Sequence, residues 1–399
     1  MKKKYSILNS LLYLTSFFVL LPNKVKEVPF ILLLAYSLLI FKKNKFNTKL
    51  FLFFTLYFTA NLLSLFYSQD LNCGLSKLGG TLSFLYIPFS FIVLSNSETN
   101  LNLFSLKKWS FYFNGSSFIF LIVFISYFLF QQVPISYNNV RTILEKIPLI
   151  GIHPIYLSIL SVLGMLLSFF LFNEHKKTSS FFIVSQLSLL IISGTRSTIV
   201  IFIIIAFTLI LMSQLNKSLK FLILIFSVLL ITMFFYQDTD FKKRFREIIL
   251  PVSYSKVNLN NSTSVRNAIW RCSIIEIQKS NIFIGNGIGD VPTKLKECYD
   301  CNYPELDESY NSHNEYFSII LGMGGVGLLS IFSLMFYFIR HAIIHKNKYL
   351  VVLMFFYLYM FAFENILERK WGILPFLFFS FFVFNFFIKQ RQDSSYGFE

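Results

Sequence analysis

Three widely separated side chains could carry out transfer chemistry on a phosphorylated substrate: Arg196, Arg266 and His313. A guanidinium group binds phosphate oxygens through parallel hydrogen bonds, so the arginines could hold a phosphate or pyrophosphate. Histidine, whose unperturbed pKa of about 6.5 suits proton transfer near neutral pH, could act as a general base. Each also has an ordinary explanation: solvation for Arg266, snorkelling to lipid headgroups for Arg196, and a structural hydrogen bond for His313.

The chain that must position these side chains has the composition of a membrane protein. Of its 399 residues, 55% are hydrophobic, 14% are charged and 52 are Phe. No soluble domain of this size needs so much apolar surface. Because a hydrocarbon core takes roughly 20 apolar residues per helix, the recurring apolar runs predict an all-α integral membrane protein of about 12 transmembrane helices. Topology explains the formal charge of +16 better than nucleic-acid binding does.

The apolar runs divide the chain into three parts. Residues 1–236 are expected to hold transmembrane helices 1–9, residues 237–312 a periplasmic loop domain, and residues 313–399 helices 10–12 with a short cytoplasmic tail. The expected spans lie near residues 5–22, 28–41, 50–67, 78–94, 110–131, 154–172, 179–194, 197–213, 219–236, 313–339, 349–365 and 371–388.

The distribution of basic residues orients these spans. Lys2, Lys3 and Lys4 precede the first span, which has no cleavage site of the signal-peptide type and is expected to be retained. With both termini inside, 18 of the 36 Lys and Arg residues fall on the inner side, 8 in short outer connections and 10 in the long outer segment. This positive-inside bias predicts cytoplasmic termini. Arg196, Arg266 and His313 then share the outer face.

Residues 261–277 show helical spacing after hydroxyl residues that can cap a helix, which places Arg266 in a first helical turn. A phosphate could bind there, at the positive helix end. Asp238 and Asp240 form a D-x-D pattern, but two oxygen ligands are few for a hard cation, and we expect no metal or other cofactor. Gly287 and Gly289 are expected to form a tight turn close to substrate or to a helix.

All four cysteines, Cys73, Cys272, Cys298 and Cys301, fall on the expected outer side. An oxidising compartment favours disulfides there. The sequence leaves the pairing open, and Cys298 and Cys301 could instead form a zinc or redox pair.

Three ordered motifs carry a family resemblance over roughly residues 190–340. They are the Ser-Gly-Thr-Arg-Ser turn ending at Ser197, the stretch from Arg266 through Trp270 to the glycine-rich segment 283–290, and His313-Asn314 leading into the glycines of 322–327. In this order the chain resembles the O-antigen ligase superfamily, which also contains O-antigen and capsule polymerases and protein O-oligosaccharyltransferases.

The resemblance implies a membrane glycosyltransferase of the bacterial inner membrane. It would transfer a glycan from undecaprenyl pyrophosphate to an acceptor hydroxyl at the periplasmic face, without a metal and with inversion. In that family Arg196 and Arg266 match pyrophosphate-binding arginines, and His313 matches the essential histidine. Asn314, Gly287, Gly289 and His153, which stands at the outer start of the sixth span, are possible supporting residues.

The acceptor is less well defined than the core chemistry. We expect a ligase acting on a lipid A-core sugar, because the long outer segment lies between the ninth and tenth spans, as in ligases of the superfamily. The alternatives are an O-antigen, capsule or exopolysaccharide polymerase, a protein glycosyltransferase, or a transporter or flippase for lipid-linked glycans. Transporters usually place ionisable groups near the midplane, whereas here Glu364 lies near the outer end of the eleventh span.

Overall fold

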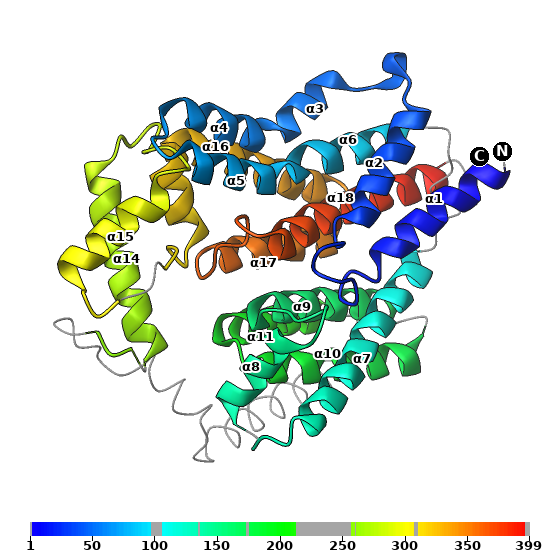
Figure 1. Cartoon of the computed structure of the whole chain (residues 1–399). Coiled ribbons are helices and arrows are strands. Elements are labelled where there is room, and N and C mark those ends of the chain that lie inside the picture. The colour runs from blue at the N-terminus through cyan, green and yellow to red at the C-terminus, as the bar shows by residue number, and fades with distance from the viewer. Residues whose placement is uncertain are drawn as a thin grey trace. The chain divides into compact units, whose positions relative to one another are not determined.

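The computed structural model describes residues 2–96, 106–134, 136–172, 175–212, 257–259, 261–306 and 310–395. Every regular element in these ranges is an α-helix or a short 3-10 helix (Figure 1), which agrees with the predicted all-α class. The ninth expected span, near residues 219–236, and the Asp238–Asp240 pattern lie outside the described residues.

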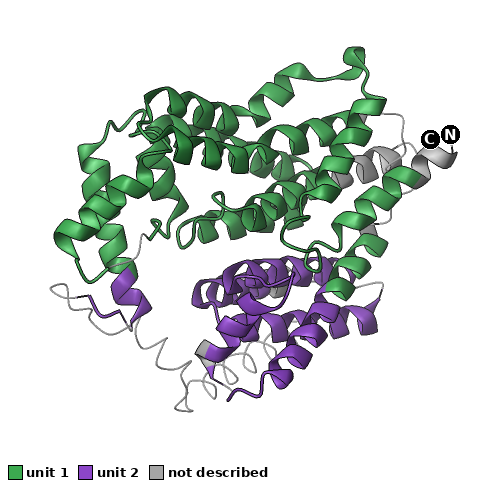
Figure 2. Ribbon diagram, in the orientation of Figure 1, with its two compact units in different colours: residues 1–116, 266–399 green, residues 117–265 purple. Residues whose placement is uncertain are grey.

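The chain divides into two compact units (Figure 2). Unit 1 comprises residues 1–116 and 266–399, and unit 2 comprises residues 117–265. The helices wholly within unit 1 are α1 (Lys2–Thr15), α2 (Val28–Ile40), α3 (Thr48–Phe54), α4 (Leu56–Ser64), α5 (Leu71–Thr81), α6 (Ser83–Asn96), α15 (Val291–Asn302), α16 (Glu315–Ile344), α17 (Lys348–Phe361) and α18 (Lys370–Ser395). Those within unit 2 are α8 (Tyr137–Lys146), α9 (Pro154–Leu171), α10 (Lys176–Ser193) and α11 (Arg196–Met212). Helices α7 (Leu106–Phe130) and α14 (Ser262–Lys279) have residues in both units.

Several of these helices have the length and apolarity of membrane spans. Four segments among the described residues qualify outright, and the bent pair α3–α4, which turns by 54°, would make a fifth. The four are Leu71–Ser95, Lys107–Phe130, Pro154–Leu171 and Glu315–Ile344. Every expected span within the described ranges overlaps a helix, but the count of 12 remains a prediction.

Phenylalanine fills the centre of unit 1. Phe54 on α3 stacks on Phe338 of α16 with 5.8 Å between ring centroids, and it meets the edge of Phe381 of α18 at 4.8 Å. All three side chains are almost completely buried. Large rings give much contact area with few rotatable bonds, so the high Phe content lets these helices pack tightly in a setting where both lipid and core are apolar.

Helix α16 is interrupted at Gly324, whose φ of 59° lies in the left-handed region. The segment 281–290 crosses α16 at this break and bonds to its backbone: Asn286 N–H donates to the Leu321 carbonyl at 2.7 Å, and Gly325 N–H donates to the Ile282 carbonyl at 2.8 Å. A Cβ at Gly324 would collide with the backbone of Phe283. Glycine is therefore required where the two segments cross.

A disulfide joins Cys272 on α14 to Cys298 on α15. The expectation of a disulfide is thus confirmed for this pair. Cys73 and Cys301 are free thiols, so Cys298 pairs with Cys272 rather than with Cys301. The bridge fastens together two helices that belong to no apolar span.

Candidate functional site

Arg266 lies close to the start of α14, on a helix that the sequence predicts well. The Asn261 side chain accepts hydrogen bonds from the backbone N–H groups of Thr263 at 2.9 Å and Ser264 at 3.1 Å, which caps the helix. Because α14 begins at Ser262, Arg266 is its fifth residue. The expectation of a place in the first turn was therefore wrong by one position, and the N–H groups of the first turn, three of which donate to Asn261, lie before Arg266.

His313 occupies a constrained backbone position directly before α16. Its φ of 44° is left-handed, which is uncommon for any residue other than glycine. Its N–H donates to the Asn311 side chain at 3.3 Å. Asn314, predicted as a supporting residue, is the N-cap of α16 and accepts from the Phe317 N–H at 3.2 Å. Strained positions of this kind persist where the surroundings hold them, and they concentrate at functional sites.

One carboxylate joins His313 to Arg266. Glu364 lies in the segment between α17 and α18; its Oε1 is 3.2 Å from His313 Nδ1, and its Oε2 is 3.4 Å from an Arg266 terminal nitrogen. The Glu364 side chain is only 9% exposed, whereas those of His313 and Arg266 are 27% and 33% exposed. Thus a buried anion holds one imidazole and one guanidinium group that both remain open to solvent on one side.

The arrangement fixes what each group can do chemically. If Glu364 accepts the Nδ1 proton of neutral His313, then Nε2 carries the free lone pair and can take a proton from a hydroxyl. This is the orienting role that a carboxylate plays beside a histidine base in many hydrolases. Arg266 has five N–H donors, and the bond to Glu364 leaves others for an anionic ligand.

A hydrogen-bond network supports the loop that carries His313. The Asn365 side chain, 1% exposed, accepts from the Asn314 N–H at 3.1 Å and donates to Ser318 at 2.6 Å and to Glu368 at 2.9 Å. Ser312 bonds to Ser318 at 2.9 Å. Residues on both sides of His313 are therefore fixed to the same segment that carries Glu364, and this rigidity preserves the geometry of the base.

Arg196 belongs to unit 2. It is the first residue of α11, directly after the turn in which Gly194, at a φ of 57°, ends α10. Its guanidinium group donates to Ser262 and, at 3.5 Å, to Thr263. Ser262 and Thr263 form the first turn of α14, the helix that carries Arg266 one turn later. Within unit 2, the structure thus brings the Ser-Gly-Thr-Arg-Ser turn to the first two residues of α14.

The other candidate residues have contacts that explain their positions structurally. His153 caps α9 by accepting from the Ile155 N–H at 3.4 Å, and its Nε2 lies 3.6 Å from Glu145. A Cβ at Gly287, where φ is 95°, would strike Ser68, and a Cβ at Gly289 would strike the Asp70 carbonyl. These two glycines therefore allow the segment 281–290 to pack against its neighbours.

Sequence reasoning did not include Glu364 and Asn365 among the site residues. A signal for Glu364 was present, because it is a lone acidic residue at the outer end of an apolar span, on the same expected face as His313 and Arg266. No spacing pattern indicated Asn365, since its role depends on contacts with residues 51 to 53 positions earlier. Among the described residues, no cluster of three or more His, Cys, Asp or Glu could hold a metal ion.

The apolar helices indicate a multi-pass membrane protein, in which one buried carboxylate links an imidazole and a guanidinium group. A family model described as O-antigen ligase matches residues 181–332. The superfamily predicted from the sequence is thereby confirmed over these residues, which include Arg196, Arg266 and His313. The match indicates a function of the O-antigen ligase or polymerase type. No curated protein matches the chain.

Proposed function

We propose that the chain is an O-antigen ligase-like glycosyltransferase of the bacterial inner membrane. It moves a glycan from undecaprenyl pyrophosphate to an acceptor hydroxyl, a lipid A-core sugar, at the periplasmic face. The observation that carries the proposal is the Glu364 carboxylate, which lies 3.2 Å from His313 Nδ1 and 3.4 Å from Arg266. The Glu364 carboxylate thus holds the proposed base, His313, and the proposed anion-binding group, Arg266, next to each other.

In this mechanism His313 is the general base. Its Nε2 takes the proton of the acceptor hydroxyl as the hydroxyl oxygen attacks the anomeric carbon of the donor sugar. Glu364 accepts the Nδ1 hydrogen bond and stabilises the imidazolium that forms. Because one base and one attacking oxygen suffice, the reaction is a single in-line displacement and inverts the anomeric configuration, with no paired-carboxylate nucleophile.

Arg266 and Arg196 act on the leaving group. As the bond between the anomeric carbon and the phosphate oxygen breaks, its electron pair goes to undecaprenyl pyrophosphate, whose negative charge increases. Guanidinium groups placed at these oxygens stabilise the transition state more than the ground state. A pyrophosphate is already a good leaving group, so positioned positive charge is sufficient and no metal takes part.

A reconstitution experiment tests the proposal. Purified protein in liposomes is supplied with undecaprenyl-pyrophosphate oligosaccharide and either lipid A-core or a second lipid-linked glycan as acceptor. Transfer to lipid A-core identifies a ligase, and elongation of the second lipid-linked glycan identifies a polymerase. Arg196→Ala, Arg266→Ala and His313→Ala should each abolish most transfer. Arg271→Ala on α14 and His175→Ala, both at exposed positions, are the matched controls; full transfer by all three site variants would refute the mechanism.

The free thiol of Cys301 gives an independent test of topology. Cys301 is exposed, whereas Cys298 is bound in the disulfide. In a Cys73→Ser background, a membrane-impermeant maleimide should label Cys301 from the periplasmic side of intact cells with a permeabilised outer membrane. Labelling that requires permeabilisation of the inner membrane would place the long loop, and the site with it, in the cytoplasm.

A further inference from the structure

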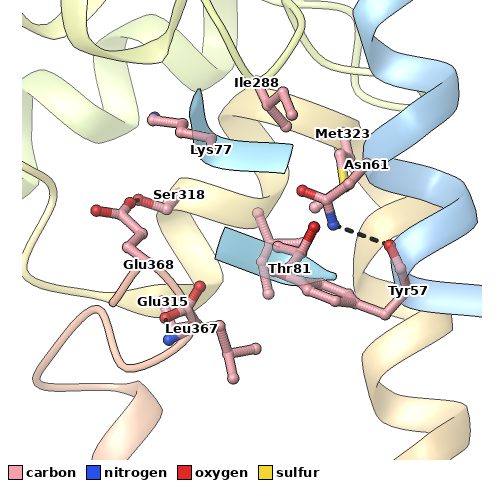
Figure 3. A pocket seen from close by; sticks show the side chains of 11 residues that line it. Tyr57, Asn61, Lys77, Thr81, Ile288, Glu315, Ser318, Met323, Leu367 and Glu368 are labelled. Carbon is pink, nitrogen blue, oxygen red and sulfur yellow. Dashed lines mark hydrogen bonds between the residues drawn. The ribbon is translucent and has the colours of Figure 1, made fainter. Parts of the chain in front are cut away.

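The segment 281–290, which crosses α16, has a buried part and an exposed part. Residues 285–290 are largely buried, and Ile288 lines a cavity together with Met323 of α16 (Figure 3). The residues before them expose three consecutive apolar side chains: Ile282 is 64% exposed, Phe283 73% and Ile284 43%. We call residues 282–284 the apolar tip. Exposed apolar patches mark surfaces that contact a partner or a membrane.

The crossing lies at a depth that the hydrocarbon of a bilayer would occupy. Helix α16 is long and apolar enough to span the membrane, and the first charged residue after Glu315 is Arg340. Arg340 therefore lies close to the inner edge of the hydrocarbon core. Gly325, whose N–H donates to Ile282, is 15 residues before Arg340, or about 22 Å at roughly 1.5 Å per residue. Because the core is about 30 Å thick, the crossing lies about 8 Å below its outer edge.

The bonding at the break in α16 is compatible with this depth. The left-handed Gly324 interrupts the helical pattern, and hydrocarbon cannot solvate backbone groups that a break leaves over. Two carbonyls and two N–H groups of α16 at the break bond to the crossing segment. Besides the two bonds given above, the Gly322 carbonyl accepts from the Gly287 N–H at 2.9 Å, and the Val326 N–H donates to the Phe283 carbonyl at 3.1 Å. The crossing segment thus supplies partners to the interrupted helix.

The apolar tip also has partners for its own backbone. Two of its carbonyls accept from α16, and that of Ile284 accepts from the Tyr67 hydroxyl at 2.6 Å. The Asn281 side chain accepts from the Phe283 N–H at 2.9 Å and from the Ile284 N–H at 3.4 Å. Non-helical backbone is tolerated at membrane depth only where its polar groups are satisfied within the protein. Three carbonyls and two N–H groups of the tip meet this requirement.

The tip is continuous with a face of α16 that suits contact with lipid. The exposed apolar residues of this face recur every three or four positions, so they share one side of the helix. They are Val326, Leu329, Phe332 and Phe336. The bond between Phe283 and Val326 joins the tip to the outer end of this face. On the other flank, Phe66, which is 85% exposed, precedes Tyr67, the hydrogen-bond partner of the tip.

We propose that the apolar tip inserts into the hydrocarbon of the outer leaflet and contacts lipid acyl chains. Acyl chains are the occupant that the surface favours, because the tip extends the exposed apolar face of α16 and residues 280–289 carry no charge. The long outer segment, expected to be periplasmic, then re-enters the membrane where it crosses α16. This inference goes beyond the proposed function, since it depends on no feature of the glycan chemistry.

Site-directed spin labelling tests the insertion. The three tip residues are replaced one at a time by Cys in a Cys73→Ser, Cys301→Ser background, which keeps the disulfide, and each variant is labelled with a nitroxide in proteoliposomes. Oxygen partitions into hydrocarbon and a nickel chelate stays in water, so their relative collision rates with the label report its depth. Leu329→Cys on the exposed face of α16 is the membrane control, and Lys296→Cys, exposed on α15, is the aqueous control.

The labels on the tip should collide preferentially with oxygen, as at Leu329→Cys, and should report a depth of about 8 Å below the outer edge of the core. The collision pattern of Lys296→Cys at all three positions would overturn the insertion. Labels that neither reagent reaches would show that protein covers the tip, which would overturn the lipid contact as well. All three side chains are exposed, so their replacement leaves the core intact. Because no substrate is used, the result stands or falls separately from glycan transfer.

Discussion

Replacement of Glu364 by Gln tests whether catalysis needs the negative charge of Glu364 or only a side chain of that size beside His313 and Arg266. Gln keeps the size of the side chain and one acceptor oxygen, but it removes the charge that His313 and Arg266 share. Hydrogen bonds to a charged group contribute about 1.5–3 kcal/mol, and each 1.4 kcal/mol is a factor of ten. Because the two contacts, at 3.2 and 3.4 Å, are long, we take the lower part of this range. The expected loss in kcat/KM is about 10- to 40-fold.

The assay is glycan transfer by the reconstituted protein, with thermal unfolding as the check on folding. Glu276→Gln is the matched control. Glu276 is also a buried carboxylate, 5% exposed, and it pairs with Lys279 at 2.7 Å on α14, but it has no described contact with His313. Glu276→Gln should retain close to full activity. If folded Glu364→Gln transfers glycan within about twofold of wild type, the carboxylate does not orient the base and the reasoning fails.

Further predictions concern the scaffold. A double variant, Cys272→Ser with Cys298→Ser, removes the disulfide across a separation of 26 residues and should lower the free energy of unfolding by about 2–4 kcal/mol, measured by thermal unfolding in detergent. The control double variant, Cys73→Ser with Cys301→Ser, replaces the two free thiols and should leave stability almost unchanged. Gly287→Ala should lower the free energy of unfolding by about 1–3 kcal/mol, because φ is 95° and a Cβ would strike Ser68. Gly79→Ala is the control, since the space around its Cβ position is open and the variant should not be destabilised. Equal Tm values for the two variants would show that Gly287 is not required where the segments cross. Burial lowers the pKa of Lys26, in the connection before α2, from 10.5 to about 7. The folded state then binds fewer protons than the unfolded state between pH 7 and 10.5, so stability should rise with pH across this window, and Lys26→Met should flatten the rise.

The sequence predicted the parts of this protein that depend on local composition. Apolar runs marked the helices, and the hydroxyl residues 262–264 with the spacing after them marked α14, although the side chain that caps it is that of Asn261. The superfamily followed from short motifs that contain Arg196, Arg266 and His313. These features are local or are read in order along the chain, so no knowledge of tertiary contacts was needed.

The features that could not be predicted from the sequence depend on contacts between residues that are far apart in the chain. His313 meets Glu364 across 51 positions, and Asp290 accepts hydrogen bonds from the backbone N–H groups of Gln69 and Asp70, which lie 221 and 220 positions earlier. The pairing of Cys272 with Cys298 is one of several that the spacing allows, and it is decided by how α14 packs on α15. Likewise, the amino-acid composition around His313 does not predict its left-handed φ, because contacts of the folded protein impose that conformation.

The central claim is that His313 removes the proton from an acceptor hydroxyl that displaces undecaprenyl pyrophosphate. The most direct measurement is the release of undecaprenyl pyrophosphate by the reconstituted protein, followed with and without acceptor. The account predicts one molecule released for each glycan transferred by wild type, only when acceptor is present, and almost none from His313→Ala. Equal acceptor-dependent release by folded His313→Ala would contradict it.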